Sequence, residues 1–205
     1  MRASDIFFKM IIGKKIVLFF DTETTGLPRS WNAPVSDVDN WPRLVQLATV
    51  SYSFNERPKM IRRRQFIIRP DGFEIPEASS RIHGITTERA RAEGVPVREA
   101  LKTFYSDVVG CDILVGHNID FDKKIVGAEL IRAGFPPVRP ERRKICTMKE
   151  SIRFCALPRY KWPKLVELHH KLFGRGFEGA HDAMNDVEAT AACFWGLVER
   201  GVIKI

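Results

Sequence analysis

The chain has 205 residues, 44% of them hydrophobic and 28% charged, which excludes an intrinsically disordered protein and allows one globular domain with a sizeable core. Its 33 Lys and Arg against 25 Asp and Glu give a formal net charge of +8, which favours a polyanionic partner such as nucleic acid. No uncharged apolar run reaches the roughly 18 residues that a membrane-spanning helix needs, so we expect no membrane partner.

The predicted elements follow a loose N-terminal extension, residues 1–12, and belong to a single domain, 13–205. Apolar and β-branched runs predict five strands, at residues 15–21, 43–54, 60–70, 112–117 and 144–148. Helical spacing and Gly or Pro stop signals predict short helices within 76–92, a longer one from 96, and further helices at 120–133, 164–174 and 182–199. Strands that come first and then alternate with helices indicate an α/β domain with a mixed sheet.

The cysteines and the N-terminus bear on location. Because none of the cysteines forms a CxxC pair, the sequence indicates neither a zinc site nor a disulfide framework. No small-residue cleavage site follows the N-terminal apolar residues, so we expect no signal peptide and a cytoplasmic location. The cysteines expected as buried thiols are Cys111, Cys146, Cys155 and Cys193.

The first candidate site is the stretch FFDTETTGLP, residues 19–28, where an apolar strand ends in two carboxylates. Alternate side chains of a strand share a face, so Asp21 and Glu23 point the same way and Thr22 points the opposite way. Two anions this close repel each other unless a positive charge lies between them. By itself the pair also fits a strand end with solvated carboxylates.

The second acidic pair follows the fourth predicted strand, in HNIDFD, residues 117–122. Asp120 suits the N-cap of the next helix, where its side chain would accept a backbone N–H. Asp122 lies in the first turn, where the helix dipole favours an anion. Both residues therefore have a structural explanation beside a functional one.

The third group, HDAMND at residues 181–186, stands at the start of the last predicted helix. Asp182 is the expected cap, which leaves His181 in the loop before the helix and Asp186 one turn inside it. The two would not share a face of one helix. They converge only if the histidine reaches back from the loop, and a lone histidine at such a place is more often a surface or capping group.

Together, DTETTG, HNIDFD and HDAMND resemble the motifs of the DEDD superfamily of 3′–5′ exonucleases, in the branch that carries a histidine. RIHGIT, residues 81–86, is a further stretch similar to that family, and the resemblance covers nearly the whole chain after Gly13. It implies a ribonuclease H-like fold with a five-stranded mixed sheet flanked by helices. DTETTG is most similar to the proofreading exonucleases of bacterial replicative polymerases.

The resemblance also implies the chemistry of the site. Two divalent cations, Mg²⁺ or Mn²⁺, would stabilise the attacked phosphate, and both ions prefer carboxylate oxygens. By resemblance, Asp21 bridges both cations, Glu23 and Asp186 complete the first cation site, and Asp122 supports the second. His181 would be the general base that deprotonates the attacking water.

Four further residues are expected to bind substrate. Thr24, Thr25 and Leu27 are similar to the family's receptor for the terminal nucleotide, with Leu27 against the last base. Their alternative role is to form the turn after the strand. Asn118 is expected either to position a sugar or, as a structural residue, to orient His117 or cap a turn.

Three basic runs add to the nucleic-acid interpretation, although each one by itself is more often a solvated face. They are RRR at 62–64, RPERRK at 139–144 and RYKWPK at 159–164, and the last interleaves aromatic with basic residues, as single-strand binding sites do. We therefore expect a nucleic-acid partner.

The sequence thus favours a metal-dependent 3′–5′ exonuclease that hydrolyses DNA from its 3′ end and releases nucleoside 5′-monophosphates. The alternative substrate is RNA or short oligonucleotides. Two other classes stay open: a non-catalytic nucleic-acid binding module, and an accessory subunit that tethers a polymerase. The protein partner stays open between a polymerase and a second copy of the chain.

Overall fold

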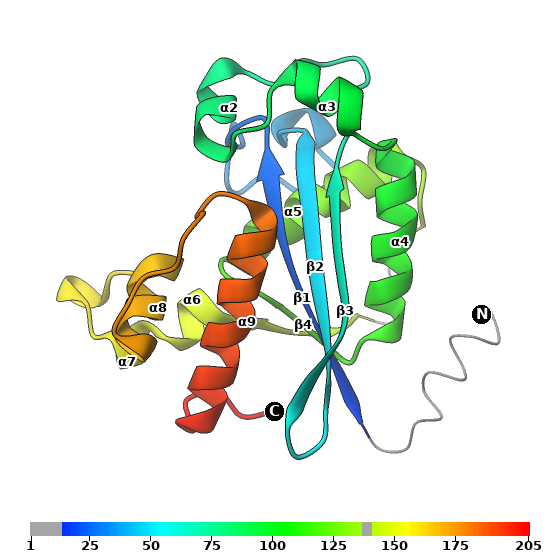
Figure 1. The fold of residues 1–205 in the computed structure, drawn as a ribbon. Helices are drawn as coiled ribbons and strands as arrows, with labels where there is room; N and C mark the ends of the chain where they lie inside the picture. Colours follow the sequence, from blue (N-terminus) through cyan, green and yellow to red (C-terminus); the bar gives the residue numbers. More distant parts are fainter. Residues whose placement is uncertain (1–13, 137–140) are drawn as a thin grey trace.

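The fold is that of a mixed β-sheet covered by helices on both faces, as Figure 1 shows for the computed structural model, which describes residues 14–136 and 141–205. The sheet has five strands in the order β3-β2-β1-β4-β5. Their bounds are β1 Lys15–Thr24, β2 Leu44–Phe54, β3 Pro58–Ile67, β4 Ile113–Gly116 and β5 Arg143–Cys146. The central strand β1 is antiparallel to β2 and parallel to β4. The expected five-stranded mixed sheet is therefore confirmed, while the predicted extension, residues 1–12, lies outside the described residues.

Helices lie in the connections that follow β3 and β4, and further helices follow the last strand, β5. They are α2 Glu77–His83, α3 Thr87–Glu93, α4 Val97–Gly110, α5 Ile119–Arg132, α6 Thr147–Glu150, α7 Ile152–Cys155, α8 Leu165–Phe173 and α9 Ala183–Glu199. Two short 3₁₀ helices, η1 Val38–Asn40 and η2 Pro158–Tyr160, lie in the longer connections. The last strand ends two residues before its predicted end, because Thr147 already begins α6.

The core is divided into two layers by the alternation of side chains along β1. Val17 and Phe19 pack on one face with residues of α8 and α9, and Leu18 and Phe20 pack on the other with residues of α4 and α5. The same alternation continues beyond Phe20, so Asp21 and Glu23 lie on the α9 face. All four cysteines are buried free thiols, as expected.

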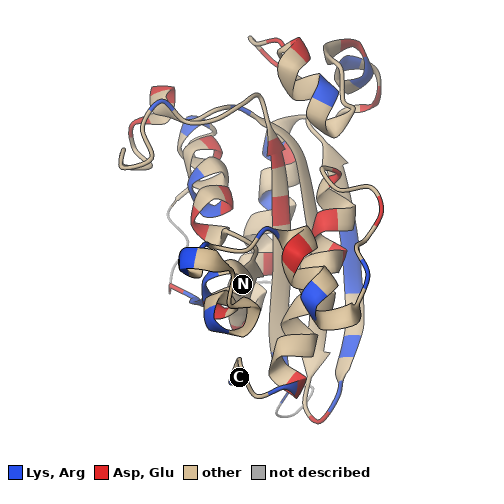
Figure 2. Cartoon of the chain, turned by 90° about the vertical axis from the view of Figure 1, so that its left-hand side faces the viewer, with Lys and Arg blue, Asp and Glu red and all other residues tan. Residues whose placement is uncertain are grey.

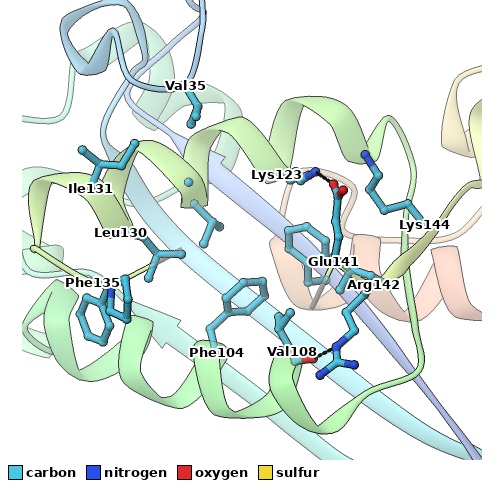
Figure 3. Close-up of a pocket in the computed structure, with 15 residues that line it drawn as sticks. Val35, Phe104, Val108, Lys123, Leu130, Ile131, Phe135, Glu141, Arg142 and Lys144 are labelled. Carbon is cyan, nitrogen blue, oxygen red and sulfur yellow. Dashed lines mark hydrogen bonds and ion pairs between the residues drawn. The ribbon is translucent and has the colours of Figure 1, made fainter. Parts of the chain in front are cut away.

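A cavity of about 420 Å³ lies between α4, α5 and the sheet (Figure 3). Its wall is mostly apolar, with Phe104 and Leu130 among its lining residues, and charged side chains lie at one end. There Lys123 pairs with Glu141 at 3.1 Å, and Arg142 Nε donates to the Val108 carbonyl at 3.1 Å. None of the acidic or histidine residues singled out above lines this cavity.

Among the described residues, no helix combines the length and the apolar character needed to cross a membrane.

Candidate active site

Two carboxylates lie at the end of β1, where this strand extends beyond its neighbour β4. β4 pairs with β1 only at Val17, Leu18 and Phe19. Beyond Phe19, no strand of the described residues lies on the β4 side of β1, while β2 still pairs with Asp21 and Glu23 on the other side. Both residues keep partial solvent exposure at this edge.

Asp122 reaches this edge from the first turn of α5. One oxygen of its buried carboxylate accepts from the Thr22 backbone N–H at 3.0 Å and from the Thr22 hydroxyl at 2.6 Å. The carboxylate therefore bonds a strand N–H that β4 is too short to satisfy. Asp122 is thus fixed to the residue between Asp21 and Glu23.

The start of α9 is fixed to the sheet by Gln46, which lies opposite Glu23 on β2. The buried Gln46 side chain accepts from the Ala183 N–H at 2.9 Å and donates to Asp182 at 3.1 Å. Asp182 caps the helix as predicted, since its other oxygen accepts from the N–H groups of Met184 and Asn185. These bonds place the first turn of α9, including Asp186, above the acidic end of β1.

His181 reaches back toward the site from the loop, although it is five residues before Asp186. Its backbone is left-handed, with φ of 69°, and its N–H donates to Asp186 Oδ2 at 3.1 Å. One ligand atom from each of Glu23, His181 and Asp186 lies within 4.8 Å of the other two. The predicted convergence of the histidine with the acids is therefore present, and it depends on the unusual backbone angle.

Burial and mutual repulsion raise the pKa values of these acids. Burial is the largest cause for Glu23, whose pKa rises to about 8, and the charges of Asp186 and Asp122 add to it. Burial also raises the pKa of Asp122 to about 7, although the Thr22 hydrogen bonds oppose the rise. The pKa values of Asp21 and Asp186 are raised for the same first reason.

This donor set fits hard divalent cations. Four carboxylates supply oxygen ligands, which Mg²⁺ and Mn²⁺ prefer, and no described residue offers a cysteine to the cluster. No positive charge of the described residues opposes the raised pKa of Glu23 or Asp122, whereas the charge of His181 partly offsets the rise at Asp186. The cluster therefore has the ligand chemistry that a divalent cation needs.

The residues that follow the acidic pair, 24–27, form a tight turn. The Thr24 hydroxyl donates to the Gly26 carbonyl at 2.7 Å, and the Thr25 N–H and hydroxyl both bond to the backbone of Arg43. Leu27 has no such role, and its side chain is 73% exposed. Among the predicted substrate-binding residues of this turn, Thr24, Thr25 and Leu27, the leucine is the one with an exposed side chain.

One interpretation of the turn before α5 needs correction. Asp120 does not cap the helix: α5 begins at Ile119, and the Asp120 carboxylate pairs with Lys149 at 2.5 Å. The N-cap is Asn118, whose side chain makes no capping bond and whose backbone is left-handed, with φ of 67°. Asparagine tolerates this conformation better than most residues, which explains Asn118 at this turn, and its expected contact with a sugar stays a prediction.

Two neighbours of the site were not singled out from the sequence. In the sequence, Gln46 is an ordinary polar residue of a strand, and only the tertiary structure shows its hydrogen bonds to the start of α9. His83, in the RIHGIT stretch, is buried, and its Nε2 has no hydrogen-bond partner among the described residues. Burial lowers the pKa of His83, and the Thr24 backbone and the charge of His181 also act on it, so His83 lies beside the site.

The basic runs have different surroundings. Arg62 and Arg64 both pair with the buried Asp107, and Arg63 pairs with Glu188 at 2.6 Å. The arginines of RRR therefore form ion pairs within the chain. Residues 139 and 140 of RPERRK lie outside the described residues. Figure 2 shows Lys and Arg on several separate elements, so the positive charge forms no single stripe on this side.

Comparisons with known proteins agree with the geometry. A family model described as an exonuclease, RNase_T, matches residues 18–194. The PolC-type DNA polymerase III of Listeria monocytogenes is 29% identical over 180 residues, which cover 88% of this chain and 11% of the polymerase. This chain thus spans about a tenth of that relative's length.

Two solved structures share the fold. E. coli Exonuclease I in complex with a dT13 oligonucleotide has a TM-score of 0.70 at 24% identity, with 90% of this chain and 41% of that chain covered. Exonuclease X in complex with 5′ overhanging duplex DNA has a TM-score of 0.60 at 24% identity, with 90% and 93% covered. Since the family model extends over most of the domain and includes all three acidic motifs, the chain belongs to the RNase_T exonuclease family.

Proposed function

We propose that this chain is a metal-dependent 3′–5′ exonuclease that hydrolyses DNA and releases nucleoside 5′-monophosphates. The observation that supports this most is the meeting of four carboxylates and one histidine, from β1, α5, α9 and the loop before α9, at the free edge of one strand. Family membership supports the exonuclease class, and Exonuclease I and Exonuclease X, which share the fold, were solved with DNA.

Each residue has a role that its surroundings support. Asp21, Glu23, Asp122 and Asp186 would hold divalent cations, whose charge offsets the negative charge that develops on the attacked phosphate. His181 would accept the proton of the attacking water, and its exposure in the loop leaves its ring accessible to substrate. The bond from its own N–H to Asp186 holds the histidine beside the acids.

The terminal nucleotide would lie over the turn after β1. The exposed Leu27 side chain offers an apolar contact for a base, and Thr24 and Thr25 hold the turn that presents it. Asn118 lies in the turn that begins α5, close in the chain to Asp122, and its side chain is available for a sugar. A polymerase is the protein partner that the relation to PolC favours.

The test uses three 5′-labelled polymers: single-stranded DNA, RNA of the same sequence, and duplex DNA with a mismatched 3′ end. Each is incubated with Mg²⁺, Mn²⁺ or chelator, beside an Asp186→Ala control. The expected result is a metal-dependent ladder that shortens from the 3′ end, is fastest on DNA and is absent with the control. A faster ladder on RNA would identify RNA rather than DNA as the substrate. The absence of a ladder with every polymer and metal would reject the exonuclease activity.

A further inference from the structure

Residues 156–164, ALPRYKWPK, which we call the aromatic–basic segment, cross from α7 to α8. Tyr160 is 69% exposed and Trp162 is 55% exposed. The cations Arg159, Lys161 and Lys164 alternate with them, and the segment contains no acidic residue. Exposed aromatic rings interleaved with cations are the composition with which proteins bind single-stranded nucleic acid, because rings stack on bases and cations contact phosphates.

The segment is held in a defined shape. Arg159 and Tyr160 have left-handed backbones, with φ of 58° and 52°, which residues other than glycine rarely adopt unless their surroundings impose it. The Tyr160 N–H donates to the Leu157 carbonyl at 2.9 Å, and the Lys161 ammonium pairs with Glu167 on α8 at 3.0 Å. The two aromatic side chains are therefore displayed by an ordered backbone.

Two contacts place the segment beside the candidate active site. The His117 ring bonds to the Pro163 carbonyl at 3.0 Å, and His117 lies in the turn that leads from β4 to α5. The Lys149 ammonium lies 5.9 Å from the centre of the Trp162 ring and pairs with Asp120 in the first turn of α5. That turn also carries Asp122, so a strand whose 3′ end is bound at the carboxylates has this surface within reach.

We propose that the aromatic–basic segment, together with Lys149, binds the single-stranded stretch that lies 5′ of the nucleotide being removed. This inference rests on the proposed function for the position of the 3′ end. Trp162 and Tyr160 would stack on bases without regard to sequence, and Arg159 and Lys161 would contact phosphates. A nucleic acid fits better than a protein partner because the segment is purely cationic as well as aromatic.

The test compares how affinity grows with strand length. The Arg159→Gln/Tyr160→Ser/Trp162→Ser variant is measured beside Arg57→Gln/Met60→Ser, which removes an exposed arginine and an exposed apolar side chain near the β2–β3 hairpin at the opposite end of the sheet. All proteins carry Asp186→Asn, so that binding is followed without turnover. The probes are 5′-labelled dT15 and dT3 and a blunt 15-base-pair duplex, and the readouts are anisotropy and circular dichroism.

We expect the preference for dT15 over dT3 to fall about 10- to 100-fold in the triple variant and to stay unchanged in the control. We also expect Arg159→Gln alone to lower the salt slope of dT15 binding by about 0.7, unlike Arg57→Gln. If the natural chain and the folded triple variant preferred dT15 over dT3 equally, the proposal would be overturned, and a protein partner would be the remaining explanation of the exposed rings. Tighter binding of the duplex than of dT15 would overturn the proposal in the same way. A natural chain that gives no ladder but shows this length dependence would reject the exonuclease activity and keep the binding surface.

Discussion

At the scale of single residues, the acids are held in surroundings that oppose their ionisation. Burial raises the pKa values of Glu23 and Asp122, and the acids repel one another across the strand end. Stability alone does not explain acids at these positions, since an apolar or neutral side chain would avoid both the burial of a charge and the repulsion between acids. The arrangement is explained by a ligand that is positively charged.

His181 is the residue whose loss separates catalysis from metal binding. We expect His181→Ala to lower turnover on DNA by roughly 10²–10⁴-fold while Mn²⁺ binding persists. Because φ is 69° at this position, His181→Asn is the matched variant, since asparagine tolerates that backbone better than alanine. Turnover on labelled DNA and Mn²⁺ titration check the prediction. If Asn restored turnover, the histidine would act through its backbone rather than as a base.

Metal and pH should act together on stability. The pKa of Glu23 is about 8 in the fold against 4.5 ordinarily, so between these values the folded state binds more protons and the metal-free protein loses stability as pH rises. Burial lowers the pKa of His117 to about 4, so the contribution of His117 makes stability rise with pH. This contribution no longer changes above pH 6.5, the ordinary pKa of histidine. We therefore expect the metal-free Tm to fall from pH 6.5 to 8.5.

Saturating Mg²⁺ should raise the Tm by about 5–10 °C at pH 8.5, and by less at pH 6.5, where protons compete for the carboxylates. Thermal melts with Mg²⁺ or chelator at both pH values test this. The Glu23→Gln variant should show a weaker pH dependence without metal. A metal-free Tm that rises over this range would contradict the account of the acidic cluster.

At the scale of elements, the site depends on one side-chain anchor between a strand and a helix. Gln46 is 1% exposed and joins β2 to the start of α9, so the position of Asp186 follows from the position of β2. Gln65 bonds to the same Asp182 oxygen at 3.3 Å but lies exposed on β3. The two glutamines form a natural comparison.

We expect Gln46→Met to lower the free energy of unfolding by about 1–3 kcal/mol, because the Ala183 N–H and Asp182 lose a buried partner. Turnover should fall as well, because Asp186 is no longer held in place. Gln65→Met should change stability by less than about 0.5 kcal/mol. Urea melts and single-strand degradation rates measure both effects, and similar losses in the two variants would disprove a special role for Gln46.

At the scale of the whole molecule, one buried carboxylate on α5, that of Glu129, holds the loop between β1 and β2 against this helix. Glu129 is 1% exposed and accepts from Arg43 and Arg132 at 2.8 Å and from the Leu44 N–H at 3.2 Å. Arg132 in turn donates to the Trp41 carbonyl at 2.7 Å. The turn that follows the acidic pair is thereby connected to the helix that carries Asp122.

Removing that charge should affect the entire fold. We expect Glu129→Gln to cost about 3 kcal/mol, because it leaves two arginines without the buried negative charge that compensates theirs. Glu74→Gln, which breaks an exposed pair with Arg91, should cost less than about 1 kcal/mol. Equilibrium unfolding in urea compares the two, and an equal cost would mean that burial adds nothing to the Glu129 pair.

The sequence by itself determined the order of the elements and the identity of the clustered acids. Alternating and helical apolar spacing is a local property, so the five strands and the main helices could be read from it. The same local signals placed Asp182 as the cap of α9 correctly. They failed at Asp120, because the N-cap of α5 is the left-handed Asn118, two residues earlier than the capping preference predicts.

Only the tertiary structure decided which of these residues meet. The length of β4 relative to β1 leaves the Thr22 N–H free for Asp122, and no local pattern records that difference. Gln46 and His83 are likewise ordinary in sequence, and their neighbours come from strands and helices far along the chain. The sequence therefore specified the chemical groups of the site, whereas packing of the sheet against α5 and α9 brought them within reach of one another.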